Sequence, residues 1–236
     1  MTEYDANWVA QEEAKRAFMA ENGLYRPEDE HASCGVGLVV SIDGKPSRKV
    51  VENGIDALKA VWHRGAVDAD GKTGDGAGIH VQIPVPFFYD QIKRTGHEPR
   101  RDELMAVGQG FLPRTDFGAQ ETCRTIVESE VLRMGYSIYG WRHVPVNIEV
   151  LGEKANATRP EIEQILISNA KGVDEETFER ELYAIRRRIE KAAAAALVPG
   201  LYIASLSCRS ITHKGMMLAE QGAEFYPDRQ DERFES

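Results

Sequence analysis

Near its start, the chain carries the sequence His31-Ala32-Ser33-Cys34-Gly35-Val36-Gly37-Leu38-Val39-Val40. The last five of these residues are mostly aliphatic and β-branched, a composition that predicts a buried strand over 36–40. Cys34 would then lie at the mouth of this strand, where a side chain is held rigidly yet can still reach a cleft. Gly35 and Gly37 would leave room beside it for another backbone or a ligand. The alternative is that Cys34 is a small buried hydrophobic residue, as most free cysteines are.

The composition narrows the class of protein. With 236 residues, 42% of them hydrophobic and 28% charged, the chain can bury a sizeable core and resembles an ordinary globular protein. A formal net charge of −9 disfavours nucleic acid as a partner, because binding phosphates requires a basic face. The sequence shows neither an apolar run of the roughly 18 residues that span a bilayer nor the pattern of a signal peptide. We therefore expect a cytoplasmic protein that binds neither nucleic acid nor a membrane.

The three cysteines, Cys34, Cys123 and Cys208, are far apart in the sequence. They form neither a Cys-x-x-Cys metal pattern nor an even set for disulfides, which favours reduced thiols. Because no dense cluster of cysteine and histidine is present, we expect no metal site.

The remaining sequence alternates between helical and extended patterns. The clearest helix is 174–197, where Asp174 is a good N-cap and Phe178, Leu182 and Ile185 share one face. The expected helices are 8–21, 51–62, 87–93, 116–134 and 174–197. The expected extended segments are 36–40, 79–83, 105–112, 136–146, and 201–206 with 209–213 as either a strand pair or one long bent strand. The segment 160–168 is ambiguous by its pattern, and its apolar run at 165–167 favours a strand. Helices on both sides of sheet segments fit a layered α+β domain.

A loop rich in glycine and aspartate covers 67–78. It is too acidic for a phosphate-binding loop and lacks the Gly-Lys-Ser/Thr that opens the following helix in such loops. Asp68, Asp70 and Asp75 are oxygen ligands suited to calcium, but the EF-hand spacing and its terminal glutamate are missing. We therefore expect a loop with several bends that borders a cleft. Asp68 and Asp75 are expected to shape this loop, and we assign them no catalytic step.

Three motifs taken together resemble the start of a class II glutamine amidotransferase domain, an N-terminal-nucleophile hydrolase. They are Cys34-Gly35-Val36-Gly37, Trp62-His63-Arg64-Gly65-Ala66 and Thr73-Gly74-Asp75-Gly76-Ala77-Gly78-Ile79. Within that class, the sequence is most similar to the N-terminal glutaminase domain of the glutamate synthase large subunits, from about residue 28 to the last residue. Supporting matches lie at 159–164, 206–209, 214–221, 224–228 and 233–236. The resemblance implies a four-layer αββα sandwich, with 1–33 as a leader and 34–236 as the N-terminal part of the amidotransferase domain.

In this family the nucleophile is a cysteine exposed by cleavage of the leader, and the resemblance implies this role for Cys34. Its thiolate attacks the amide carbon of L-glutamine, and a nearby base must accept the thiol proton. A free α-amino group, with a pKa of about 7.7–8.0, can serve as that base, whereas an amide nitrogen cannot. Cleavage before Cys34 therefore creates nucleophile and base together, and the unprocessed chain should be inactive.

The resemblance also places Arg64 close to Cys34, where it helps to order the site, with Gly35 as a supporting residue. The alternative for Arg64 is a helix-end arginine that donates hydrogen bonds to the last carbonyls.

Other parts of the family's site come from motifs beyond Ser236. These are the arginine that holds glutamine and the asparagine-glycine pair of the oxyanion hole, which commonly contributes about 2.7–4 kcal/mol of barrier reduction. The chain therefore resembles a fragment of a longer enzyme. The FMN and the iron–sulfur cluster of the parent enzyme belong to other parts, so we expect no cofactor on this chain. The implied partners are L-glutamine, the remaining synthase domains and a synthase small subunit, with nicotinamide or ferredoxin as electron donor.

Two competing hypotheses remain open from the sequence. One is a truncated fragment that only binds or supports other parts, with Cys34 never unmasked. The other is an unrelated cysteine hydrolase, for which His63 and His80 are candidate partners although neither has a spacing that argues for it.

Overall fold

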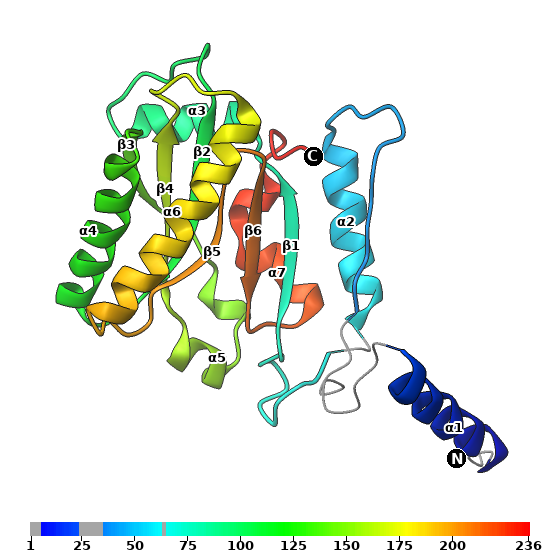
Figure 1. Cartoon of the computed structure of the whole chain (residues 1–236). Coiled ribbons are helices and arrows are strands. Elements are labelled where there is room, and N and C mark those ends of the chain that lie inside the picture. Colours follow the sequence, from blue (N-terminus) through cyan, green and yellow to red (C-terminus); the bar gives the residue numbers. More distant parts are fainter. Residues whose placement is uncertain (1–5, 24–34, 63–64) are drawn as a thin grey trace. The chain divides into compact units, whose positions relative to one another are not determined.

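The computed structural model describes residues 6–23, 35–62 and 65–236 of the chain (Figure 1). The chain divides into two compact units, Met1–Gly35 and Val36–Ser236. The first unit contains helix α1 (Ala6–Asn22), which confirms the helix predicted over 8–21. The backbone N–H of Gly23 donates to the carbonyl of Met19 at the end of this helix.

The second unit is built around an antiparallel sheet of four strands in the order β3-β4-β2-β5. These strands are β2 (Met105–Leu112), β3 (Ser137–His143), β4 (Glu161–Ser168) and β5 (Tyr202–Ser207). β2 and β4 are buried along almost their whole length, as the apolar runs in these segments predict. The sequence therefore located all four strands of this sheet.

A second antiparallel sheet pairs β1 (Ala77–Gln82) with β6 (Ser210–Gly215), from Ala77 opposite Gly215 to Gln82 opposite Ser210. β5 and β6 are separated by only two residues, Cys208 and Arg209, yet they belong to different sheets. Of the two alternatives, the bent strand is therefore closer to the structure than a paired hairpin. This bend carries the chain from one sheet to the other.

Helices α4 (Phe117–Arg133) and α6 (Glu175–Ala195) lie along one face of the four-stranded sheet (Figure 1). The apolar face predicted for α6 is fully buried in this layer: Phe178, Leu182 and Ile185 are all 0% exposed. They pack in one cluster with Ala106 of β2 and Ile165 of β4. The apolar face of α6 thus holds the helix against the four-stranded sheet.

The other face of the four-stranded sheet packs against the two-stranded sheet, α2 (Arg48–Ala60) and α3 (Val85–Arg94). One cluster joins Val107 of β2, Leu166 of β4, Ile211 of β6, Phe88 of α3 and Val51 of α2. The short elements that complete the unit are α5 (Glu153–Thr158), α7 (Gly222–Phe225) and the 3-10 turns Ile148–Val150, Ala219–Gln221 and Pro227–Gln230. The result is an α+β fold with antiparallel sheets, as the order of elements predicts.

The buried strand predicted over 36–40 is wrong. These residues adopt no regular secondary structure, and Val36 and Leu38 are 88% and 87% exposed. A strand needs a hydrogen-bonded neighbour, and among the described residues no strand pairs with this segment. Its alternation is still visible, because Gly37 lies beside Ala57 of α2 while Val36 and Leu38 face away. β-propensity therefore predicted a buried strand that the fold does not form.

Candidate functional site

The two side chains predicted to carry the chemistry, Cys34 and Arg64, lie outside the described residues. Gly35, the third predicted site residue, is exposed and precedes the second compact unit directly. The roles of all three residues therefore remain predictions. The described segments next to them in the sequence are the largely exposed segment 36–42, the helix α2 and the loop 65–76.

Asp70 organises the tip of the glycine- and aspartate-rich loop. Its carboxylate accepts hydrogen bonds from the backbone N–H groups of Lys72 (2.9 Å) and Thr73 (2.7 Å), and from the Thr73 hydroxyl (2.6 Å). These hydrogen bonds, led by the one from the Thr73 hydroxyl, hold the pKa of Asp70 well below its usual range. Asp70 therefore fixes the geometry of the loop tip. Among the described residues, no group of three metal-binding side chains is present.

The same loop is fixed against two distant parts of the chain. Asp68 accepts from Lys154 of α5 at 2.6 Å, and the buried Thr73 lies against Gly152. On its other side Gly74 lies against the backbone of Met217, so closely that a Cβ there would be 2.5 Å from the Met217 carbonyl. The expectation that Asp68 shapes this loop is confirmed. Asp75 contributes its backbone N–H, which donates to the carbonyl of Ala66.

The helix α2 is anchored at its beginning by the C-terminal residues. Arg48 donates from Nη1 to the carbonyls of Arg229 (2.5 Å) and Asp231 (3.2 Å). The backbones of Ser47 and Ser236 pair, with Ser47 N–H 3.0 Å from the Ser236 carbonyl. These contacts fix the first turn of α2 against the C-terminal segment. Sequence reasoning missed Arg48, since nothing local distinguishes it from other surface arginines.

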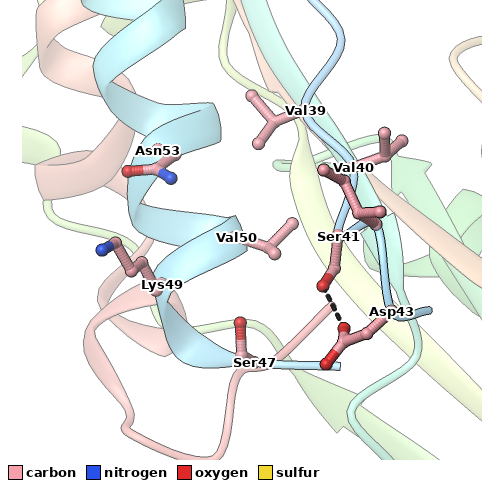
Figure 2. Close-up of a pocket in the computed structure, with 9 residues that line it drawn as sticks. Val39, Val40, Ser41, Asp43, Ser47, Lys49, Val50 and Asn53 are labelled. Carbon is pink, nitrogen blue, oxygen red and sulfur yellow. Dashed lines mark hydrogen bonds between the residues drawn. The ribbon is translucent and has the colours of Figure 1, made fainter. Parts of the chain in front are cut away.

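A shallow, open pocket of about 490 Å³ lies between the segment 39–43 and the first turns of α2 (Figure 2). Val39 and Val40 border it on one side, and Val50 and Asn53 of α2 border it on the other. Its one internal hydrogen bond drawn in the figure runs from the Ser41 hydroxyl to Asp43 at 2.5 Å. It contains no pair of groups suited to nucleophilic catalysis.

The two cysteines that the structure describes are poor nucleophiles. Cys123 is buried in α4, and burial raises the pKa of its thiol. Cys208 donates its thiol proton to Glu179 at 3.1 Å, and burial together with this carboxylate raises its pKa to about 12. Both remain thiols at neutral pH, and the thiolate is the nucleophilic form. Cys123 therefore belongs to the core.

A row of polar side chains crosses the four-stranded sheet on its inner face. Arg142, Gln164 and Gln109 stand opposite one another on β3, β4 and β2. Arg142 donates to Gln164 (2.7 Å), and Gln164 donates in turn to Gln109 (2.6 Å). Arg142 also holds the buried Asp228 by two hydrogen bonds of 2.8 and 3.0 Å. This row fastens the C-terminal segment to the sheet, and the sequence patterns gave no signal for it.

The sequence motifs near both ends of the chain resemble those of one class of protein, and the α+β fold and the anchored glycine-rich loop agree with that class. The family model of the class II glutamine amidotransferases matches residues 34–236, and the chain belongs to this family. The membership predicted from the three N-terminal motifs is therefore confirmed.

Within the family, the chain is similar to glutamate synthases. It is 62% identical to the NADPH glutamate synthase large chain of Azospirillum brasilense over 97% of this chain and 15% of that protein. It is 38% identical to the corresponding large chain of Bacillus subtilis over 91% of this chain and 14% of that protein. Identity to the ferredoxin-dependent glutamate synthase of spinach (Spinacia oleracea) is 36%, over 88% of this chain and 13% of that protein. The chain thus spans 13–15% of the length of these relatives.

Proposed function

We propose that the chain is the glutaminase part of a glutamate synthase, which hydrolyses L-glutamine to glutamate and ammonia through a thioester on Cys34. One observation carries the proposal: the family match begins at residue 34, which is Cys34 itself. In an N-terminal nucleophile, the thiol and the α-amino base belong to the same residue, which must be the first residue of the mature domain. A cysteine at the first matched position meets this requirement.

The reaction then proceeds in two halves. In the first, the α-amino group of Cys34 accepts the thiol proton and the sulfur bonds to the amide carbon of glutamine. The resulting α-ammonium group returns this proton to the amide nitrogen as the carbon–nitrogen bond breaks, which releases ammonia. In the second, the α-amino group accepts a proton from water as the water oxygen attacks the thioester carbon. The carbon–sulfur bond then breaks, glutamate leaves, and the same proton restores the thiol. Both halves pass through an oxyanion, which preorganised N–H donors stabilise.

The surroundings of the other cysteines support Cys34 as the nucleophile. Cys208 is held as a thiol by Glu179, and Cys123 is enclosed in the core. Neither can supply a thiolate at neutral pH without losing these interactions. Arg64 and Gly35 are proposed as supporting residues of the substrate site, on the ground of their motif positions.

The finer features of the domain belong to the same proposal. A four-layer αββα sandwich is supported by α4 and α6 on one sheet and by Val51 of α2 in the cluster that contains the other sheet. Residues 1–33 would be the leader, and the division of the chain into compact units next to Gly35 supports this boundary.

The parent enzyme would use the ammonia with 2-oxoglutarate to make glutamate. Its remaining domains, a small subunit, FMN and an iron–sulfur cluster would then be partners and cofactors of the whole enzyme rather than of this chain. The 62% identity to an NADPH-type large chain favours a nicotinamide as electron donor. No helix among the described residues is long and apolar enough to cross a membrane. Cytoplasmic placement remains a proposal.

Intact-mass spectrometry combined with labelling by diazo-oxo-norleucine, a reactive glutamine analogue, tests the proposal on the 236-residue chain. We expect a mature form that starts at Cys34 and carries one label. Cys34→Ser should lose the label, whereas the matched control Cys208→Ser should keep it.

The opposite pattern would contradict the proposal. An intact N-terminus without label would favour the non-catalytic alternative. A label that survives in Cys34→Ser would favour another nucleophile.

A further inference from the structure

The space between the two sheets is polar at one end, around the fully buried Tyr226. Its ring lies 4.7 Å from the ring of His213 on β6 and 5.1 Å below the guanidinium carbon of Arg229. The side chain of Gln109 on β2 lies beside its hydroxyl. Three nitrogen-bearing side chains from three segments of the chain therefore meet at one aromatic residue.

Arg229 is a buried cation that the described part of the chain leaves without a counter-charge. It is 1% exposed, and it donates from Nη1 to the carbonyl of Gly222 (2.8 Å) and from Nη2 to that of His213 (2.9 Å). Its Nε has no hydrogen-bond partner, and none of the carboxylates in the described segments forms an ion pair with it. The neighbouring Asp228 is already engaged by Arg142, with which it forms two hydrogen bonds.

His213 and Gln109 present further unpaired nitrogens in the same place. His213 is 0% exposed, and neither Nδ1 nor Nε2 has a partner in the described structure. Gln109, also 0% exposed, accepts from Gln164 through its oxygen. Its Nε2 faces the Tyr226 hydroxyl, which itself donates to the Lys214 carbonyl, but it makes no hydrogen bond of regular geometry. The neutral imidazole has one N–H group, so each of the three side chains has a donor to spare.

We propose that these donors hold a small monatomic anion of the halide class, with chloride as the physiological example, between Gln109, His213 and Arg229. A single anion can accept hydrogen bonds from the unpaired N–H groups of all three side chains, and its negative charge neutralises Arg229. It would tie the C-terminal segment 226–229 to β6 and β2. This site is independent of Cys34 and of the glutaminase reaction.

The charge of Arg229 distinguishes an anion from an internal water molecule. Water can accept the unpaired N–H groups, but it leaves the guanidinium charge uncompensated in the interior, where an unpaired ion is strongly unfavourable. The neighbouring cation Arg142 is neutralised by Asp228, so one unit of positive charge remains. The enclosure of the three side chains, at 0–1% exposure, favours a small ion over an oxyanion such as sulfate.

Thermal unfolding of the 236-residue chain in sodium chloride and sodium gluconate mixtures of constant ionic strength tests the site. Because chloride would bind only the folded state, the melting temperature should rise by about 3–5 °C for each tenfold increase in chloride above its dissociation constant. Gln109→Leu, which removes one donor, should flatten this slope. The matched control Arg233→Gln removes a partly exposed cation of the same segment that is paired with Asp231, and it should keep the slope.

Crystals of the wild-type chain grown in bromide give a second measurement that needs no variant. We expect an anomalous peak within hydrogen-bond reach of His213 and the Nε of Arg229. A melting temperature that follows ionic strength but not anion identity would overturn the proposal. So would electron density for water without an anomalous peak.

Discussion

Gly74 shows how a single residue can decide whether a loop fits the fold. It lies in the loop before β1, and a Cβ built on it would be 2.5 Å from both the carbon and the oxygen of the Met217 carbonyl. Real Cβ atoms do not approach a backbone so closely, and backbone atoms cannot rotate away as the end of a long side chain can. The close contact therefore requires glycine at this position.

Gly74→Ala should accordingly destabilise the fold by about 3 kcal/mol, because the loop or the Met217 backbone must move. The free energy of unfolding from urea titration, compared with that of the wild type, measures this effect. Gly37→Ala is the control, since its new Cβ would meet only the Cβ of Ala57, at an ordinary 3.6 Å. Equal stabilities of the two variants would contradict this packing.

Single residues also show which features the sequence could predict. The capping role of Asp174 was predictable, because an N-cap depends on residues within the next three positions, and its carboxylate does accept from the Thr177 N–H at 2.9 Å. The burial of Arg229 and His213 was not, because charged and titratable residues are usually exposed. Their burial follows from the stacking of two sheets under the C-terminal segment, which no local pattern encodes.

At the scale of elements, the helix α6 depends on its first turn. The Asp174 carboxylate accepts from both the backbone N–H and the hydroxyl of Thr177, and these hydrogen bonds lower its pKa. Asp174→Ala should lower the melting temperature by about 2–4 °C, since it leaves orphan N–H groups at the helix start. Asp174→Ser, which can still cap, should retain most of that stability.

The pH dependence of this effect provides a check by calorimetry. A carboxyl group with a lowered folded-state pKa stabilises the fold above its unfolded pKa, and this stabilisation is lost as the pH falls through the folded value. The difference between wild type and Asp174→Ala should therefore shrink in strong acid. A difference that stays constant there would show that the carboxylate charge does not contribute.

The helices and strands were predictable where the spacing of hydrophobic residues agrees with local signals such as caps and turn residues. The long helices and all six strands lie in segments that the sequence marks as helical or extended, including the ambiguous 160–168, which is β4. The prediction of a buried strand over 36–40 was wrong because burial requires a neighbouring strand, which the residues of the segment cannot supply. The site was less predictable than the fold: its motifs identify a family, whereas Arg48 and the polar row through Gln164 are defined only by tertiary contacts.

At the scale of the whole molecule, the second compact unit has one apolar and one polar region between its sheets. Val107, Leu166 and Ile211 form the apolar region, whereas Gln109 and His213 belong to the polar one. The polar region is covered by the C-terminal segment that also anchors α2 through Arg48. Loss of this cover would therefore loosen both the interface between the sheets and the beginning of helix α2.

His213 makes this interface sensitive to acid. Burial, together with the cations Arg229 and Arg142, lowers its pKa well below the ordinary value of 6.5, and the aromatic residues Tyr226 and Phe234 surround its ring. His213 has a higher pKa in the unfolded chain than in the folded one, so lowering the pH favours the unfolded chain. The free energy of unfolding is therefore greatest above the unfolded pKa and decreases as the pH drops below about 6.5. The free energy of unfolding should decrease by up to about 1.4 kcal/mol for each pH unit until the folded pKa is reached.

Urea titrations between pH 7.5 and 5 in sodium gluconate measure this dependence without chloride. His213→Phe keeps an aromatic ring against Tyr226 and Phe234 but cannot bind a proton, so its stability should change much less over this range. The window lies above the region where carboxylates such as Asp231, whose pKa is lowered to about 2 chiefly by its hydrogen bond from Arg233, become protonated. If both proteins lost stability in parallel, the acid sensitivity would have to arise from groups other than His213.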